Sequence, residues 1–218
     1  MTLETDIQQK GAPVAAYRTD PLFLRNGFEG DGKWGIPVVR KQPLDLSGGV
    51  ELIASSDTSL HDVKNLHKGV HHFVDDTRLE GIYRHPERTL EKYARYRFVL
   101  TPDYSLFPEM ELWRQIESVA KSRWCGAYWQ GRGLTVVPTV GWGLYPTFEF
   151  CFCGIERGSV VAVSTLGCRR GRTRFMHGYD AMLEQVLPEA VICFGKPFDE
   201  MRGEVLPVDY IVSRRMVR

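Results

Sequence analysis

The feature that most constrains this chain is a series of short apolar runs, rich in β-branched residues, that recurs along its length. Several runs are apolar throughout rather than alternating, and the clearest are VVAV at 160–163 and VIC at 191–193. Such runs are typical of strands in a parallel sheet, because that sheet is covered on both faces. The pattern predicts strands at 36–39, 51–54, 69–74, 97–100, 134–140, 159–164, 190–194 and 210–213.

Two helical patterns lie between the later strands. The first spans 108–130, where Pro108 suits a first helical position, and the second spans 172–187, before Pro188. The apolar stripe of the first helix contains Leu112, Ile116, Val119, Ala120 and Ala127. Alternation of strand and helix predicts an α/β fold with right-handed crossover helices and a parallel sheet. This sheet is either open or closed like a small (β/α) barrel, and the barrel is slightly preferred.

The length of the chain, 218 residues, suits one large domain. Residues 1–20 are polar and lack periodicity, which predicts a peripheral N-terminal arm. Residues 21–218 contain no low-complexity tract or linker, so we expect them to form a single α/β domain.

Charge and hydropathy indicate which partners and which cellular compartment to expect. Lys and Arg total 28 against 27 Asp and Glu, so no overall field would draw the molecule onto a nucleic acid or an anionic membrane. Any basic patch must be local. The N-terminus lacks an apolar signal segment, and no apolar run reaches the roughly 18 residues of a membrane span. We therefore expect a cytoplasmic protein without membrane contact, whose five cysteines are reduced and packed.

Polar and charged residues follow several of the expected strands. In parallel α/β folds the ligand lies beyond the carboxyl ends of the strands, so these residues are the candidates for a functional site. They are Asp75, Asp76, Thr101, Asp103, Tyr104, Ser105, Trp142, Ser164, Thr165, Cys168, Gly195 and Lys196. Three carboxylates and several hydroxyl groups would then meet at one rim.

Asp75, Asp76 and Asp103 are the candidate catalytic acids and bases. Neighbouring carboxylates divide these roles when their environments separate their pKa values. They also hold divalent metal ions through oxygen ligands, and Asp75 and Asp103 are the candidate ligands. Ser105 and Ser164 would orient the substrate. The alternative is that the aspartates cap turns and helix N-termini.

A basic cluster, Arg169, Arg170, Arg172 and Arg174, lies between an expected strand and the helix that follows it. Such a cluster at the start of a helix can bind phosphate groups, and the alternative is a solvated basic turn. Arg169, Arg170 and Lys196 are therefore candidate substrate-binding residues.

Aromatic side chains gather at 123–130 and recur at Trp142 and Tyr145. They can form a stacking platform for bases or sugars, or they can pack between helix and sheet, which their large apolar area favours. Trp142 follows an expected strand and is therefore a further candidate substrate-binding residue.

Two patterns approach known binding motifs but miss their spacing. Gly69 breaks any helix that would align the histidines of this region, and the neighbours His71 and His72 would point to opposite faces of a strand, which argues against zinc. The run GFEGDGK at 27–33 opens like a phosphate-binding loop, but Trp34 stands where a Ser or Thr should follow. We therefore expect only a glycine-rich turn at 27–33.

Long continuous runs between Gly69 and Tyr210 carry a family resemblance. They are GVHHFVDD, GIYRHPERTLEKYARYRFVLTPDYSLFPEM, LWRQIESVAKSRWCGAYWQGRGLTVVPTVGW, FEFCFCGIERGSVVAVSTLGC and FMHGYDAMLEQVLPEAVICFGKPFDEM. The chain closely resembles the family catalogued as domain of unknown function 4417 over about two-thirds of its length, which is far more specific than a short motif. The resemblance implies a bacterial or phage origin, often in mobile genetic elements. It supplies no reaction, cofactor or catalytic residue.

Two hypotheses for function follow. The first is a hydrolase or transferase that acts on a phosphate-bearing substrate, with or without a divalent metal ion, through Asp75, Asp76 and Asp103, while Arg169 and Arg170 hold the anion. The second is a non-catalytic accessory protein that binds nucleic acid or a host protein through its basic and aromatic residues. Self-association is left open as well.

Overall fold

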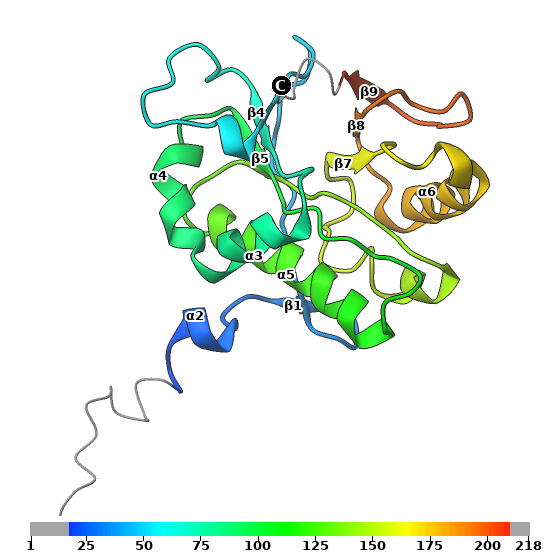
Figure 1. Cartoon of the computed structure of the whole chain (residues 1–218), viewed down its shortest axis with the longest axis horizontal. Helices are drawn as coiled ribbons and strands as arrows, with labels where there is room; N and C mark the ends of the chain where they lie inside the picture. Colours follow the sequence, from blue (N-terminus) through cyan, green and yellow to red (C-terminus); the bar gives the residue numbers. More distant parts are fainter. Residues whose placement is uncertain (1–17, 210–218) are drawn as a thin grey trace, which may run out of the picture.

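Parallel strands form the centre of the molecule (Figure 1). The computed structural model describes residues 18–209. One sheet has the order β3-β4-β5-β6, and these strands are Leu52–Ala54, Gly69–His71, Phe98–Leu100 and Val136–Val137. The other has the order β7-β8-β9, and its strands are Val161–Ser164, Val191–Phe194 and Val205–Val208. Within these two sheets every neighbouring pair of strands is parallel, which confirms the predicted sheet type.

A short bridge joins the two sheets. Thr139, beyond the end of β6, pairs in parallel with Ala162 of β7. The Val140 N–H donates to the Ala162 carbonyl at 2.7 Å, and the Ala162 N–H donates to the Pro138 carbonyl at 2.9 Å. The pairing therefore continues from the first sheet into the second, in chain order.

The joined sheet is curled. Side chains from both sheets pack in one cluster on a single face, among them Leu52, Leu100, Ala162, Ile192 and Val208. A sheet can bring its first and last strands into one cluster only if it curves strongly. Nevertheless, β3 and β9 do not pair within residues 18–209, so the barrel preferred from the sequence is not closed there.

Helices cover the outer face of the sheet. They are α3 (Asp76–Arg84), α4 (Leu90–Tyr93), α5 (Leu112–Gln130) and α6 (Arg172–Val186). Figure 1 shows the first three beside the β3–β6 sheet and α6 beside the β7–β9 sheet. Short 3₁₀ turns, η1 (Ser55–Asp57), η2 (Pro86–Thr89), η3 (Tyr145–Glu149) and η4 (Arg169–Gly171), complete the connections. Within residues 18–209, no helix has the length and hydropathy to cross a bilayer.

The predicted helices are largely confirmed. α6 ends one residue before the expected end, but α5 begins at Leu112 and not at Pro108. Its start is delayed because the Met110 N–H donates to the Phe107 carbonyl and closes a turn there. α3 and α4 were not predicted. The predicted strand 210–213 and most of the predicted arm, 1–17, lie outside the described residues.

The N-terminal segment covers α5, which is why that helix is buried on nearly all sides along its second half. The segment comprises α2 (Pro21–Leu24) and an antiparallel hairpin of β1 (Gly30–Asp31) and β2 (Ile36–Pro37). Phe28 meets Trp124 edge-on, with ring centroids 5.9 Å apart. The aromatic residues of 123–130 are thus mainly packing residues, and the glycine-rich run at 27–33 forms the expected turn.

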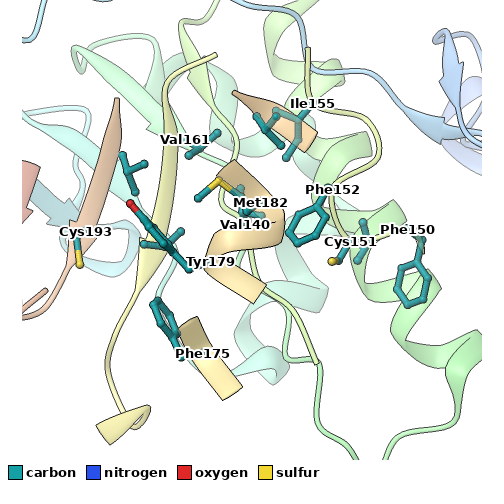
Figure 2. Close-up of a cluster of buried hydrophobic side chains, with 14 of the residues drawn as sticks. Val140, Phe150, Cys151, Phe152, Ile155, Val161, Phe175, Tyr179, Met182 and Cys193 are labelled. Atoms are coloured by element: carbon teal, nitrogen blue, oxygen red, sulfur yellow. The ribbon is translucent and has the colours of Figure 1, made fainter. Parts of the chain in front are cut away.

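A second core cluster lies between α6 and the β7–β8 strands. Figure 2 shows Tyr179 and Met182 of α6 near Val161, and Phe175 packs against Tyr179 in the same cluster as Phe152. Each of these side chains is buried. Their spacing at three and four residues places them on one face of α6, as the sequence pattern indicated.

His71 and His72 point to opposite faces of the sheet, as predicted. The His71 ring lies 4.7 Å from that of Phe194. His72 stacks on Trp129, its Nδ1 lies 2.8 Å from the Leu100 carbonyl, and its Nε2 lies 3.0 Å from the Tyr93 hydroxyl. Because a carbonyl only accepts, Nδ1 carries the proton and Nε2 accepts from Tyr93. Burial lowers the pKa of His72 to about 3, so it is a neutral core residue.

Arg123 is the most unusual residue of the core, since only 2% of it is exposed. Its guanidinium donates to the carbonyls of Thr139 at 2.8 Å, Cys151 at 3.1 Å and Cys153 at 3.2 Å. One side chain of α5 thus ties the strand end after β6 to the segment that follows η3. Removing it would leave buried acceptors without donors, which is costly.

We therefore expect Arg123→Met to lower the free energy of unfolding by about 3 kcal/mol or more. Urea denaturation monitored by tryptophan fluorescence measures this change. The matched control is Arg78→Met on the exposed face of α3, which should change stability by less than about 0.5 kcal/mol. Equal effects of the two substitutions would contradict the role given to Arg123.

Candidate functional site

The loops that follow the parallel strands meet at one edge of the sheet. Asp76 follows β4, Asp103 follows β5, Trp142 lies beyond β6, Cys168 follows β7 and Lys196 follows β8. Because all these strands run in the same direction, their carboxyl ends share an edge. We call this the carboxyl edge.

Asp76 fixes the loop after β5. Its carboxylate accepts the Ser105 N–H at 3.2 Å and the Ser105 hydroxyl at 3.1 Å. Asp76 is also the first residue of α3, where a negative charge is favoured by the helix dipole. Asp76 and Ser105 thus contact each other, and their hydrogen bonds hold the loop that also contains Asp103.

Asp103 is the titratable group of this region that stands out. Burial and repulsion from the Asp76 carboxylate raise the pKa of Asp103 to about 7, although Arg123 acts in the opposite sense. It lines a cavity of about 10 Å³ together with Ser118, Ser122 and Arg123. That volume suits about one water molecule. A carboxyl group that titrates near neutral pH can both accept and donate a proton.

Asp75 differs from its neighbour. It precedes α3 as the N-cap residue, it is exposed, and its side chain makes no capping hydrogen bond. Within residues 18–209 no group of three or more His, Cys, Asp or Glu side chains is arranged to hold a metal ion. The three aspartates therefore do not form a three-carboxylate metal site, and the metal-ligand roles of Asp75 and Asp103 stay predictions. Their catalytic roles stay predictions.

A basic pocket lies at the carboxyl ends of β7, β8 and β9. It has a volume of about 920 Å³, and its cations are Arg169, Arg170 and Lys196. Among the described residues, no carboxylate lies within 4 Å of these three cations, whereas Arg172 pairs with Glu200. Asp209 also lines the pocket.

Two features shape the basic pocket. Gly195 has a positive φ of 104°, which lets the chain turn sharply after β8. The Thr165 hydroxyl donates to the Lys196 carbonyl at 3.0 Å and ties the loops after β7 and β8 together. A smaller cavity of about 270 Å³ adjoins, and it is also lined by Arg169 and Lys196.

An aromatic pocket of about 300 Å³ lies beside the basic pocket. Its main walls are Phe107, Trp142, Phe175 and Arg174. The Trp142 ring packs against that of Phe175, with centroids 4.9 Å apart. Tyr145, by contrast, is 82% exposed and does not line this pocket. Of the two aromatic candidates, Trp142 is the one that lines the aromatic pocket.

Ser164 has a local partner. Its hydroxyl oxygen accepts the Leu166 N–H at 3.3 Å, which stabilises the turn after β7. Cys168 lies in the next turn, where burial and the Asp103 carboxylate raise the pKa of its thiol. Within residues 18–209 all five cysteines are free, as expected.

Sequence reasoning missed Arg123 and Phe107 as site residues. Arg123 opens an aromatic run of α5 two residues after Lys121, and no local pattern marks a cation at this position as buried. Nothing in the sequence indicated that Phe107 belongs to the site. Its side chain is 55% exposed, and this exposure depends on the tertiary structure around the loop.

Comparison with known proteins decides the family. Residues 28–211 match the family described as domain of unknown function (DUF4417). The chain belongs to this family. The DUF4417 match includes every strand of the curled sheet and both pockets, so the carboxyl edge lies wholly within the family's domain.

Phage proteins are among the relatives of this DUF4417 chain. It is 36% identical over 181 residues to the Gene 1 protein of Mycobacterium phage L5, an alignment that covers 81% of this chain and 78% of that protein. It is 38% identical over 130 residues to the Gene 1 protein of Mycobacterium phage D29, covering 58% of this chain and 48% of that protein. No solved structure matches the chain.

The raised pKa of Asp103 makes stability depend on pH. An unfolded aspartate titrates near pH 4, so the folded state binds the additional proton between about pH 4 and pH 7. The stabilising contribution of the neutral carboxyl group is complete below pH 4 and is lost as the pH rises through about 7. We therefore expect wild type to lose stability relative to Asp103→Asn between pH 5 and pH 8.

Urea denaturation of both proteins across this range measures the difference. Asp75→Asn serves as the control, because Asp75 is exposed, and its difference from wild type should stay constant over the same range. A constant difference for Asp103→Asn as well would contradict the raised pKa of Asp103.

Proposed function

We propose that this protein is an enzyme, a hydrolase or transferase, that binds a phosphate-bearing substrate at the carboxyl edge. The observation that carries the proposal is the basic pocket, where Arg169, Arg170 and Lys196 line a cavity of about 920 Å³ without a carboxylate within 4 Å among the described residues. Unpaired cations at a cavity favour an anionic ligand, and the arginine guanidinium matches phosphate oxygens with two parallel donors.

The start of α6 adds to the positive electrostatic potential of the basic pocket. The helix follows η4 directly, its N-cap is Gly171, and its first turn contains no acidic residue. The backbone N–H groups of the first turn therefore lack a side-chain acceptor there, and the positive end of the dipole lies next to Arg169 and Arg170. Both contributions favour an anion at this position.

Asp103 supplies the acid–base chemistry. As a carboxylate it accepts a proton from the attacking oxygen, which is water in hydrolysis or an acceptor hydroxyl in transfer. The attacking oxygen forms a bond to the substrate phosphorus while the bond from phosphorus to the leaving oxygen breaks, and Asp103 returns the proton to that leaving oxygen. A pKa of about 7 suits both steps near neutral pH. Asp76, held by Ser105, keeps that pKa high.

Titration calorimetry with inorganic phosphate at low ionic strength tests the binding step. We expect Arg169→Ala combined with Arg170→Ala to weaken phosphate binding about tenfold or more, because each charged hydrogen bond contributes about 1.5–3 kcal/mol. The control is Arg157→Ala, an exposed arginine before β7 at the opposite edge of the sheet. Similar affinities for all three proteins would refute the basic pocket as the phosphate site.

Turnover of a panel of phosphomonoesters and phosphodiesters, followed by mass spectrometry, tests the enzyme. We expect Asp103→Asn to lower turnover by about 100-fold or more while phosphate binding persists. Glu91→Gln on α4 is the control for a lost surface carboxylate. Binding of the panel without turnover by wild type would instead favour a non-catalytic accessory protein.

A further inference from the structure

Three cavities follow one another along the carboxyl edge. The cavity that contains Asp103 shares Leu106 with the aromatic pocket. The aromatic pocket in turn shares Gly167 with the basic pocket. A carboxyl group, an aromatic wall and a set of cations therefore succeed each other along one surface.

The aromatic wall is rigid on one side. A Cβ atom on Gly178 of α6 would lie 2.2 Å from the Trp142 ring, so this ring rests directly on the helix backbone. Phe175 supports it from the same helix. A flat ligand group that enters the pocket would thus meet a fixed aromatic surface, which reduces the entropy lost on binding.

The other side of the aromatic pocket is open. Phe107 is 55% exposed, although burial of a phenylalanine side chain is worth about 1.5–3 kcal/mol. Arg174, in the first turn of α6, lines the same pocket and has no carboxylate within 4 Å among the described residues. An exposed aromatic ring and an unpaired guanidinium at one cavity favour a ligand that is both flat and polar.

We propose that the ligand of the carboxyl edge is a nucleotide, with its base in the aromatic pocket and its phosphate in the basic pocket. This inference rests on the proposed function and specifies its substrate class. A nucleotide joins a planar ring to an anion through a short polar sugar, and the two pockets adjoin at Gly167.

The same chemistry is offered by a free nucleotide and by a nucleotide within a single strand, since both present a base and a phosphate. Titration calorimetry of the full chain with AMP, ribose 5-phosphate, inorganic phosphate and a single-stranded DNA hexanucleotide separates these sources. We expect AMP to bind at least about fivefold more tightly than ribose 5-phosphate, because stacking of one base contributes about 1–3 kcal/mol.

Two variants separate the contribution of the aromatic pocket to ligand binding from that of the basic pocket. Phe107→Ala removes an exposed side chain, so the fold should be unaffected, and it should lower AMP affinity to that of ribose 5-phosphate without changing phosphate binding. Arg169→Ala combined with Arg170→Ala should weaken the binding of all four ligands. Trp113→Ala is the matched control, because Trp113 is 67% exposed but lines neither pocket.

Equal affinities of AMP and ribose 5-phosphate would overturn the nucleotide assignment and leave the basic pocket intact. If none of the four ligands binds, both the nucleotide assignment and the proposed function are overturned. Binding of the hexanucleotide that depends on Phe107 and exceeds AMP binding supports a strand as the ligand. Phe107-dependent binding in which AMP equals or exceeds the strand supports a free nucleotide.

Discussion

The buried guanidinium of Arg123 is the interaction on which the arrangement of the carboxyl edge depends. It donates to carbonyl groups on both sides of η3, at Thr139 before it and at Cys151 and Cys153 after it. The chain between β6 and β7 contains little regular structure, so its backbone acceptors need donors from elsewhere. A single cation on α5 meets several of these needs, and it acts electrostatically on Asp103 as well.

The joined parallel sheet places the loops of the candidate site at a single edge. Hydrogen bonds between Val140 and Ala162 and between Ala162 and Pro138 connect the two sheets, so loops from both halves of the chain reach the same edge. Thr101 strengthens the join, because its hydroxyl oxygen accepts the Thr139 N–H at 2.9 Å and its carbonyl accepts the Thr139 hydroxyl at 2.8 Å. The acidic and basic parts of the site therefore belong to one surface.

The carboxyl edge divides into an acidic and a basic part that differ in how they are stabilised. Asp76 is held by hydrogen bonds to Ser105, and Asp103 lines a small cavity together with the buried Arg123. Arg169, Arg170 and Lys196 are exposed and have long side chains, so a ligand would have to order them. The alignment with the Gene 1 protein of Mycobacterium phage L5 covers 81% of this chain.

The sequence by itself determined the parallel sheet, the positions of α5 and α6 and the opposite orientations of His71 and His72, because apolar periodicity and strand alternation are local properties. It also pointed to strand ends as candidate positions. Only the tertiary structure decided that Asp76 turns toward Ser105 while Asp75 faces solvent, that Arg123 is buried, and that the sheet curls without closing. These outcomes depend on contacts between residues far apart in the chain, and no local pattern records which distant partner a side chain will meet.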